Sequence, residues 1–357
     1  MEEVKIRNIV NKFNIEGEFI DITPFGSGNI NNTFLVVTSI NKYILQRINS
    51  KVFTKPLDVI SNSIKVTTHI KNKLVKEGNF DSRKVLSFIK TKDNQYYYLD
   101  NNDYYRMSLY VENSISIDVV DTKEHFLEAG HAFGSFQRLL SDFDSSSLKE
   151  TIKDFHNTRK RYEHFIEVVN KNEFNRNEEV QDEIDYLINH KYLLDSFNNF
   201  NIPIRVTHND TKINNVLFDK DTSKALCVID LDTVMPGTIL SDFGDAIRSG
   251  CNSSTEDEVD LSKVHFKMEL YEVFTKGFLE ETKDILTKDE LDLLYLSPLL
   301  LTYELALRFL SDYLEGDIYF KTTRLNQNLD RTRTQIKLIK EMEEHLSEMK
   351  DIINKYR

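Results

Sequence analysis

The sequence predicts an α+β fold with two lobes, the first rich in β-strands and the second mostly helical. Three observations lead to this prediction. Short apolar runs separated by polar turns fill most of the first third of the 357 residues. Apolar residues at helical spacing dominate after about Glu112, and one hairpin pattern interrupts them. We therefore expect an N-terminal lobe over residues 1–112 and a C-terminal lobe over residues 113–357.

The N-terminal lobe is expected to hold five or six strands, mostly antiparallel, and one helix. The predicted strands are residues 19–24, 33–37, 43–48, 85–89, 95–99 and 105–111. The helix is predicted over residues 57–74, where apolar side chains recur at roughly helical spacing. A stretch that contains Gly26 and Gly28 separates the first two strands.

The C-terminal lobe is expected to begin with helices and to end with them. The predicted helices before the hairpin are residues 126–140, 158–169 and 178–198. The hairpin pairs residues 216–218 with residues 225–229, because polar residues separate these two apolar runs. Helices dominate again after residue 261, and one long charged helix is predicted from about Arg324.

Composition excludes several classes of protein. The formal net charge is −12 and no basic block occurs, which argues against a nucleic-acid partner. No run of 18 apolar residues is present, so no membrane span is expected. Residues 1–17 have mixed charge and lack the apolar centre of a signal peptide. The two cysteines cannot form a metal cluster, and Cys227 is expected to be buried and reduced, which favours the cytoplasm.

The most informative residues lie at the start of the hairpin and just before it. His208 and Asp210 are followed by Asn215, and the hairpin ends at Asp230. A hairpin turn places Asn215 roughly opposite Asp230, and paired positions lie on the order of 5 Å apart. Carboxylate and amide oxygens are ligands that Mg²⁺ accepts, and they hold it on a nucleotide in phosphoryl transfer. The alternative is that both residues only end strands.

The loop that leads into the hairpin carries the predicted catalytic groups. Asp210 is expected to accept the proton of a substrate hydroxyl, and Lys212 could contact the transferring phosphate. His208 is expected to brace the loop. Asp242 belongs to an Asp-Phe-Gly triplet, but no strand pattern leads into it, so we predict a buried brace and assign the metal to Asp230. As alternatives, Asp210 could be a turn residue and Lys212 a solvent-exposed side chain.

The nucleotide is expected to contact the N-terminal lobe. Gly26, Ser27 and Gly28 could cover phosphates, because glycine lets backbone amides approach closely. The third strand lacks the lysine that many kinases use there, so Gln46 or Arg47 must replace it. Strand alternation allows only one of the two to face the nucleotide, and the sequence leaves the choice open. Adenine is expected against the linker that ends at Glu112.

These motifs resemble those of the aminoglycoside phosphotransferase and choline kinase family, which is related to the protein kinases. The family's H-x-D-x-x-x-x-N loop is matched by His208, Asp210 and Asn215, and its I-D motif by Ile229 and Asp230. Its G-D-P-x-x-D segment is matched only in spacing, over residues 237–242. The resemblance implies a protein-kinase-like fold and a kinase that uses ATP and Mg²⁺.

The wording of the loop also resembles one subgroup, the bacterial N-acetylhexosamine 1-kinases. Its likeness extends to HNDTKINNVL, VIDLDTVMPG, residues 155–158 and residues 304–320. This implies transfer of the γ-phosphate to the anomeric C1 hydroxyl of N-acetylglucosamine or N-acetylgalactosamine, with Arg308 and Tyr319 at the sugar. Arg308 lies in an apolar helix pattern and needs a partner, such as Asp232, Asp242 or a sugar oxygen.

Two other functions stay open on the sequence. The same kinase could phosphorylate an amino alcohol or an aminoglycoside, because an acidic cleft rim would attract cationic acceptors. A degenerate kinase that only binds nucleotide is the other alternative, and the missing third-strand lysine motivates it. The expected partners are small molecules, ATP and a sugar, and the chain is expected to be a monomer or a weak homodimer.

Overall fold

The structure is a computed structural model that describes residues 2–26 and 30–357. Contacts divide the chain into two units. The first comprises Met1–Ser116, Leu139–Lys153 and Asn215–Pro236; the second comprises Ile117–Arg138, Asp154–Asn214 and Gly237–Arg357. The boundary expected between residues 112 and 113 stays a prediction. Each unit is assembled from several separate segments of the chain, so the division does not correspond to a single boundary in the sequence. The expected fold class is confirmed, with an antiparallel sheet in the N-terminal region and helices in the C-terminal region.

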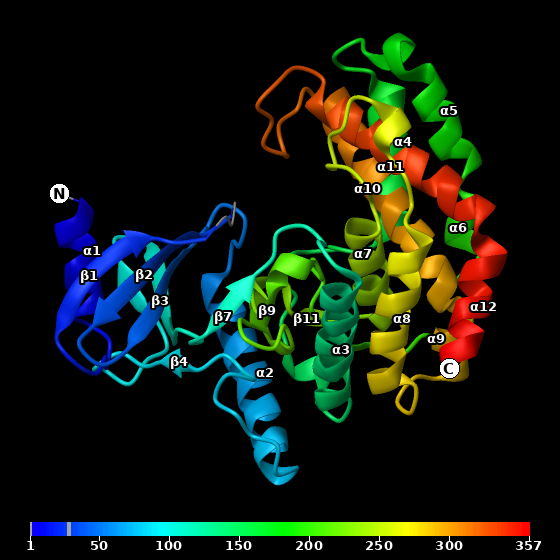
Figure 1. Cartoon of the computed structure of the whole chain (residues 1–357). Coiled ribbons are helices and arrows are strands. Elements are labelled where there is room, and N and C mark those ends of the chain that lie inside the picture. The colour runs from blue at the N-terminus through cyan, green and yellow to red at the C-terminus, as the bar shows by residue number, and fades with distance from the viewer. Residues whose placement is uncertain (1, 27–29) are drawn as a thin grey trace. The chain divides into compact units, whose positions relative to one another are not determined.

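The main sheet of the first unit has six strands (Figure 1). The strands are β1 (Phe19–Pro24), β2 (Asn32–Thr38), β3 (Lys42–Ile48), β4 (Phe88–Ile89), β5 (Tyr98–Asp100) and β6 (Asp103–Leu109). Their order is β1-β2-β3-β6-β4, and β5 also pairs with β6. Every one of these pairs is antiparallel. The six predicted strands are therefore present, although the fourth and fifth are shorter than predicted.

The prediction of a single helix in this region is wrong, because the described residues form two helices here. α2 (Pro56–Lys76) is the predicted helix, and α1 (Glu2–Val10) precedes the sheet. Ile6, Ile9 and Val10 of α1 lie on one helical face and are buried in a cluster with strand residues such as Leu45 and Met107. Burial against the sheet stabilises a helix that would be marginal alone at nine residues.

A buried asparagine holds the later segments of the first unit to α2. The Asn62 side chain is 0% exposed and donates to the carbonyls of Lys149 (2.7 Å) and Val234 (2.8 Å). It also accepts from the backbone amide of Lys149 at 3.0 Å. Because a buried amide group must satisfy its hydrogen bonds, Asn62 fixes residues 149 and 234 against this helix.

The predicted hairpin is confirmed within a second, three-stranded sheet. Its strands are β7 (Ser114–Ser116), β9 (Val216–Asp219) and β10 (Ala225–Val228), in the order β10-β9-β7. Val216 pairs with Val228, and Phe218 pairs with Ala225. The polar residues between the two strands form the turn, as their composition predicts.

The second unit is mainly helical. Its helices are α3 (Lys123–Leu139), α4 (Thr158–Lys171), α5 (Gln181–Asn189), α6 (Tyr192–Asp195), α7 (Ile239–Gly250), α8 (Met268–Thr282), α9 (Lys288–Leu293), α10 (Ser297–Leu314), α11 (Gln327–Glu344) and α12 (Leu346–Tyr356). Two short strands, β8 (Arg205–Thr207) and β11 (Met235–Gly237), lie near the unit boundaries in sequence. α10 is buried over most of its length and packs against α4, α7 and α11 (Figure 1).

Two predicted helices are wrong in extent. Residues 178–198 form a short 3-10 turn, α5 and α6 instead of one helix. At the end of α5 the ring of His190 stacks on Tyr186, and its Nδ1 lies 2.7 Å from the Tyr186 carbonyl oxygen. The single long helix predicted from Arg324 is two helices that meet at His345. After this break α12 packs against α8, and its residues Met349 and Ile353 are buried.

Glycine allows α3 and α8 to approach closely. A Cβ atom at Gly130 would lie 2.5 Å from the carbonyl oxygen of Phe274, and one at Gly134 would lie 2.8 Å from that of Phe278. No side chain larger than hydrogen fits these positions without a shift of backbone. Gly130 and Gly134 therefore mark a contact between these two helices.

One stretch, Lys288–Leu314, is long and apolar enough to be considered as a membrane span. It includes α10, and 78% of its most apolar window is buried inside the protein. A helix that is buried to this extent is typical of a protein core. The stretch is therefore only weak evidence for a membrane-spanning helix. The sequence expectation of no membrane span is not overturned by it.

Candidate active site

The loop that carries Asp210 covers residues 206–214 and is called the Asp210 loop here. Asp242 of α7 holds its backbone: Oδ2 accepts from the amide of His208 at 2.9 Å and Oδ1 from the amide of Asn209 at 2.8 Å. Gln137 donates to Oδ2 at 2.7 Å. Asp242 is 2% exposed, and burial raises the pKa of its carboxyl group. Asp242 occupies the position that a brace of this loop requires.

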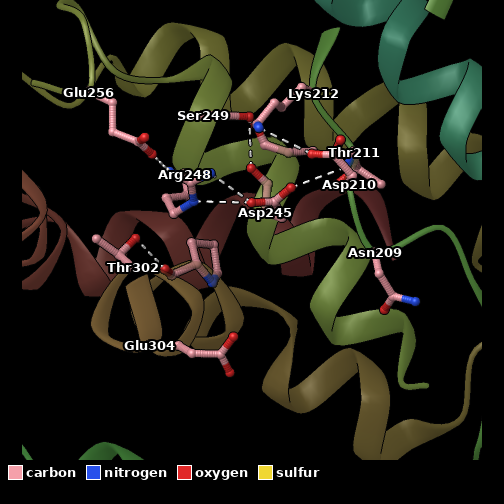
Figure 2. Close-up of polar contacts among 12 residues, drawn as sticks. Asn209, Asp210, Thr211, Lys212, Asp245, Arg248, Ser249, Glu256, Thr302 and Glu304 are labelled. Carbon is pink, nitrogen blue, oxygen red and sulfur yellow. Dashed lines mark hydrogen bonds and ion pairs between the residues drawn. The ribbon is translucent and has the colours of Figure 1, made fainter. Parts of the chain in front are cut away.

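A second aspartate of α7 supports the next residue of the loop. Asp245 Oδ2 accepts from the amide of Thr211 at 3.1 Å, while its Oδ1 accepts from Arg248 (Figure 2). Arg248 also donates to Glu256 at 2.8 Å. The Thr211 hydroxyl donates to the carbonyl of Asp242 at 2.6 Å. A buried carboxylate with a paired arginine therefore fixes the backbone beside Asp210.

Lys212 and Asp210 form an ion pair, with Nζ 3.3 Å from Oδ1. The negative charge of Asp210, more than any other group, raises the pKa of Lys212. The lysine side chain is 49% exposed and the aspartate side chain 30% exposed, so both can contact a solute. The pair places a permanent positive charge beside the predicted proton acceptor, which suits the transfer of an anionic phosphoryl group.

His208 is 0% exposed, with Phe133 and Phe136 set edge-on to its ring at 5.7 and 5.8 Å. Its Nδ1 accepts from the backbone amide of Asp210 at 3.3 Å. A ring buried among phenylalanines and bonded to its own loop is in the position of a brace.

Asn215 and Asp230 lie at the open end of the hairpin in the first unit. The backbone amide of Ile229 donates to the carbonyl of Asn215 at 2.9 Å, so Asn215 pairs with the residue just before Asp230. Asp230 has φ 56° and ψ 59°, a left-handed conformation that turns the chain into a 3-10 helix at Leu231–Thr233. The two residues are therefore adjacent across the hairpin, one position from the direct pairing that the sequence predicts.

The alternation of β3 separates Gln46 from Arg47. Gln46 Oε1 accepts from Nε of Arg106 at 3.0 Å, whereas Arg47 donates to Asn32 at 3.0 Å and lies 3.5 Å from Asp103. Arg106 also forms a buried ion pair with Asp232, two residues after Asp230. Gln46 is therefore the residue on the side of the Asp230 segment, and a nucleotide contact there remains a prediction.

The glycine stretch is described only in part. Gly26 has φ 79°, and a Cβ there would meet nothing within 4 Å, while Ser27 and Gly28 lie outside the described residues. Asn31, at the end of the stretch, donates to Asp232 at 2.5 Å. Glu112 pairs with Lys42 at 3.3 Å on the surface. The predicted nucleotide contacts of Gly26 and Glu112 remain predictions.

Arg308 and Tyr319 line one pocket in the second unit. The other lining residues are Arg161, His164, Ser311, Asp312, Glu315 and Phe320. The Arg308 guanidinium lies 5.4 Å from the ring centroid of Phe155, 5.4 Å from that of Phe320 and 5.9 Å from that of Tyr319. Attraction between a cation and aromatic rings stabilises this arrangement.

The sequence suggested Asp232 or Asp242 as a carboxylate partner of Arg308, and this suggestion is wrong. Asp242 is bonded to the Asp210 loop, and Asp232 is bonded to Arg106 and Asn31. Arg308 instead lies among aromatic rings, one helical turn from Glu304. Sequence could not show this, because the rings come from segments before α4 and after α10.

The carboxylates of the pocket have partners within the protein. Asp312 accepts from the amides of Ile318 (3.0 Å), Tyr319 (2.7 Å) and Phe320 (3.0 Å). Glu315 lies 3.2 Å from His164. By contrast, Nε of Arg161 is buried without a hydrogen-bond partner among the described residues. Burial, with the nearby charge of Arg308 as the next cause, lowers the pKa of Arg161.

Residues 21–267 match the model of a protein family described as the phosphotransferase enzyme family, which is more than half of the chain. The chain belongs to this phosphotransferase family. Membership identifies the chain as a phosphotransferase.

Solved structures share the phosphotransferase fold over nearly the whole chain. A microcompartment-associated aminopropanol kinase matches 97% of this chain and 98% of its own, with 14% identity and a TM-score of 0.62. An aminoglycoside phosphotransferase from Alicyclobacillus acidocaldarius matches 98% and 96%, with 11% identity and a TM-score of 0.60. Spectinomycin phosphotransferase, solved with ADP and spectinomycin, matches 94% and 97%, with 11% identity and a TM-score of 0.55. At these identities the likeness concerns the fold alone.

Sequence reasoning assigned no role to three ionisable residues that contact the candidate segments within each unit. They are Arg106 in the first unit, and Asp245 and His156 in the second. Arg106 interrupts an apolar strand, and Asp245 and Arg248 are charged residues three apart in an apolar helix. A charge inside an apolar pattern is the signal that could have found the first two, because buried charges need partners.

Proposed function

We propose that the protein is a kinase that uses ATP and Mg²⁺ to phosphorylate the anomeric C1 hydroxyl of N-acetylhexosamines. The observation that carries the choice of acceptor is the pocket around Arg308. Its guanidinium groups and aromatic rings suit an uncharged acceptor rich in oxygen atoms. The likeness of residues 155–158 and 304–320 to N-acetylhexosamine 1-kinases supports the same choice.

The charges of the pocket do not single out a cationic acceptor. Arg161 and Arg308 supply two positive charges, Asp312 and Glu315 supply two negative charges, and the carboxylate oxygens already accept from protein groups. The repulsion between an ammonium group and a guanidinium, on the order of 1–4 kcal/mol at 4 Å near a protein surface, is offset where a carboxylate lies equally close. Hydroxyl and acetamido oxygens, by contrast, accept hydrogen bonds from guanidinium. Aromatic rings offer a flat apolar wall to a sugar ring.

In the proposed reaction, Asp210 orients the sugar C1 hydroxyl and accepts its proton. The hydroxyl oxygen forms a bond to the γ-phosphorus as the bond to the leaving ADP oxygen breaks. An anomeric hydroxyl is more acidic than an ordinary alcohol, so a carboxylate suffices as the base. Lys212 provides positive charge beside the reacting phosphoryl group.

The donor set at the hairpin fits a magnesium ion. Asn215 supplies an amide oxygen and Asp230 a carboxylate, and Mg²⁺ is held in many kinases by one or two such oxygens together with phosphates and water. When bound, the ion neutralises phosphate charge. Gln46, Gly26, Ser27, Gly28 and Glu112 remain the proposed nucleotide contacts.

We also propose that the enzyme acts in the cytoplasm as a monomer or weak homodimer. Cys227 and Cys251 are free and buried, and burial raises the pKa of Cys227 to about 12. A thiol with that pKa is protonated at neutral pH and chemically quiet. A reducing compartment is therefore compatible with both residues.

A coupled ADP-release assay with Mg²⁺-ATP tests the acceptor. The panel is N-acetylglucosamine, N-acetylgalactosamine, glucose, galactose, choline, 1-amino-2-propanol and kanamycin. We expect turnover with the acetamido sugars and a phosphate on C1 by NMR. Turnover confined to the cationic acceptors would overturn the sugar assignment and select the amino alcohol or aminoglycoside alternative, which the named solved structures represent.

A further inference from the structure

A buried histidine contacts both α10 and the Asp210 loop. His156 lies just before α4, with its side chain 10% exposed. Its Nδ1 lies 2.8 Å from Oε1 of Glu304, and its Nε2 lies 3.2 Å from the backbone carbonyl oxygen of Asn209. Glu304 is 0% exposed and also accepts from the Thr158 hydroxyl at 2.6 Å. All of these groups belong to the second unit.

Both ring nitrogens of His156 face acceptors. A carboxylate oxygen and a carbonyl oxygen have no proton to give, so each of these contacts is a hydrogen bond only if the ring nitrogen donates. A neutral imidazole donates from one nitrogen alone. With Glu304 ionised, as its lowered pKa favours, both contacts are hydrogen bonds only in the doubly protonated, positively charged ring.

The carbonyl that His156 contacts is at a critical place in the loop. Asn209 has φ 65°, which a residue other than glycine adopts rarely, and it directly precedes Asp210. Its amide is held by Asp242 at 2.8 Å, and its carbonyl faces His156. Two bonds on opposite sides of Asn209 therefore maintain this conformation and set the direction of the Asp210 side chain.

The same histidine is coupled to the acceptor pocket. Glu304 and Arg308 are four residues apart on α10, so they share one helical face. Phe155, the neighbour of His156 in sequence, lies against the Arg308 guanidinium, and its ring is 4.6 Å from the His156 ring. Figure 2 shows Glu304 and Asn209 with the charged residues of the loop.

We propose that His156, charged and held by Glu304, is a positioning residue that aligns Asp210 from the helix that carries the acceptor pocket. The proposal rests on the proposed function in one respect, that Asp210 is the catalytic base. It extends that function by giving residues 155–158 a structural role, because they join Arg308 of the pocket to the backbone of the Asp210 loop.

The charged groups around His156 support this charge state. Burial lowers the pKa of His156, but the charge of Glu304 and a hydrogen bond to it act in the opposite direction, and the pKa is raised overall. Asp245 of α7 adds to this effect. The charges of His156 and Arg308 in turn contribute to the lowered pKa of Glu304. The raised pKa of His156 therefore favours the charged ring, in the same direction as the two acceptors that its nitrogens face.

The first test is His156→Gln, measured with Mg²⁺-ATP and the acceptor that gives turnover. We expect kcat to fall about 10- to 100-fold, because a small misplacement of a catalytic group has effects of this size. The KM for ATP should stay within about twofold of the wild-type value. A folded variant with wild-type kcat would overturn the proposal.

The matched control is His190→Gln. His190 also lies between a carboxylate, Glu343 at 3.3 Å, and a carbonyl, Tyr186 at 2.7 Å, but it contacts α5 and α11 and not the Asp210 loop. Its kcat should match the wild type. An equal fall of kcat in both variants would indicate a general effect of removing a buried histidine and would overturn the assignment to His156.

The second test adds a readout other than activity. Nitrogen-15 NMR of the histidine rings in the wild-type protein at pH 7.5 reports whether both nitrogens of His156 carry protons, with the signals assigned by comparison with His156→Gln. We expect two protonated nitrogens, and one unprotonated nitrogen would overturn the proposal. In Glu304→Gln we expect a neutral ring and a kcat reduced like that of His156→Gln.

The two tests separate this inference from the proposed function. If the acetamido sugars are not acceptors but another compound is, the kcat loss is expected with that compound. A charged His156 together with unimpaired turnover in His156→Gln would leave the proposed reaction standing and remove the positioning role.

Discussion

The Asp210 loop and the segment after α10, residues 315–326, are anchored alike but differ in exposure. In each, a buried aspartate accepts from successive backbone amides: Asp242 in the first and Asp312 in the second. The Asp210 loop buries His208 and Thr211 completely or nearly so. The second segment, called the Tyr319 loop here, leaves Ile318 77% and Tyr319 62% exposed.

The difference indicates that the two loops have separate roles. Buried side chains of the Asp210 loop fix the backbone, so Asp210 and Lys212 are held for a reaction that tolerates little displacement. Exposed side chains of the Tyr319 loop can change without loss of core packing, because surface substitutions have small effects on stability. We infer that the first loop carries the chemistry that the family shares and the second carries acceptor preference.

Asp210→Asn should produce the largest effect. The amide cannot accept the hydroxyl proton, and general base catalysis contributes about 10²- to 10⁴-fold. We expect kcat to fall by that factor while Mg²⁺-ATP still raises the melting temperature. Steady-state kinetics and thermal shift measure the two quantities, and Asp221→Asn on the surface is the control. Wild-type turnover in Asp210→Asn would remove the base assignment.

Asp242→Asn tests the anchor of the Asp210 loop. In the variant, one carboxylate oxygen becomes an NH₂ group that faces a donor, so buried donors lose their acceptor. Each buried donor left without an acceptor costs about 1–3 kcal/mol. We therefore expect the free energy of unfolding to fall by about 3 kcal/mol. Urea denaturation measures it.

The control for this anchor is Asp260→Asn. Asp260 also accepts from a backbone amide, that of Ser262 at 3.1 Å, but on the exposed surface. Its loss should cost about 1 kcal/mol or less. Equal losses in the two variants would mean that burial of Asp242 adds nothing to its effect.

Asp312→Asn tests the anchor of the Tyr319 loop in the same way. Loss of an acceptor for the amides of Tyr319 and Phe320 should displace their rings from Arg308. We expect the KM for the acceptor to rise about tenfold, or about 1.4 kcal/mol, with the KM for ATP unchanged. Initial rates over a matrix of both substrates measure this. A rise in the KM for ATP with no change in the KM for the acceptor would contradict the separate roles of the two loops.

Tyr319→Ala should have the smallest effect. It removes one mostly exposed ring beside Arg308, and cation–π contacts at exposed sites contribute about 0.5–1 kcal/mol. We expect the acceptor KM to rise about three- to fivefold and the melting temperature to stay within a degree or so. Tyr162→Ala, which also removes a tyrosine of the second unit, is the control.

Local sequence determined much of the fold. Apolar alternation and polar turns predicted the six strands of the first sheet, and helical spacing predicted α2, α3 and α4. The spacing from His208 to Asp230 predicted the hairpin and the candidate site. These features depend on residues within one or two turns or strand pairs, so one sequence is enough to find them.

The tertiary structure decided the partners of the charged residues. His156 meets Glu304 across 148 positions of the sequence, and Arg106 meets Asp232 across the gap between two segments of the first unit. It also decided that Gln46 rather than Arg47 lies on the side of the Asp230 segment, and that aromatic rings surround Arg308. Local periodicity places such a residue on a helix or a strand. Only packing determines which distant group neutralises its charge, because the cost of an unpaired buried charge is removed by whichever partner the folded chain brings near.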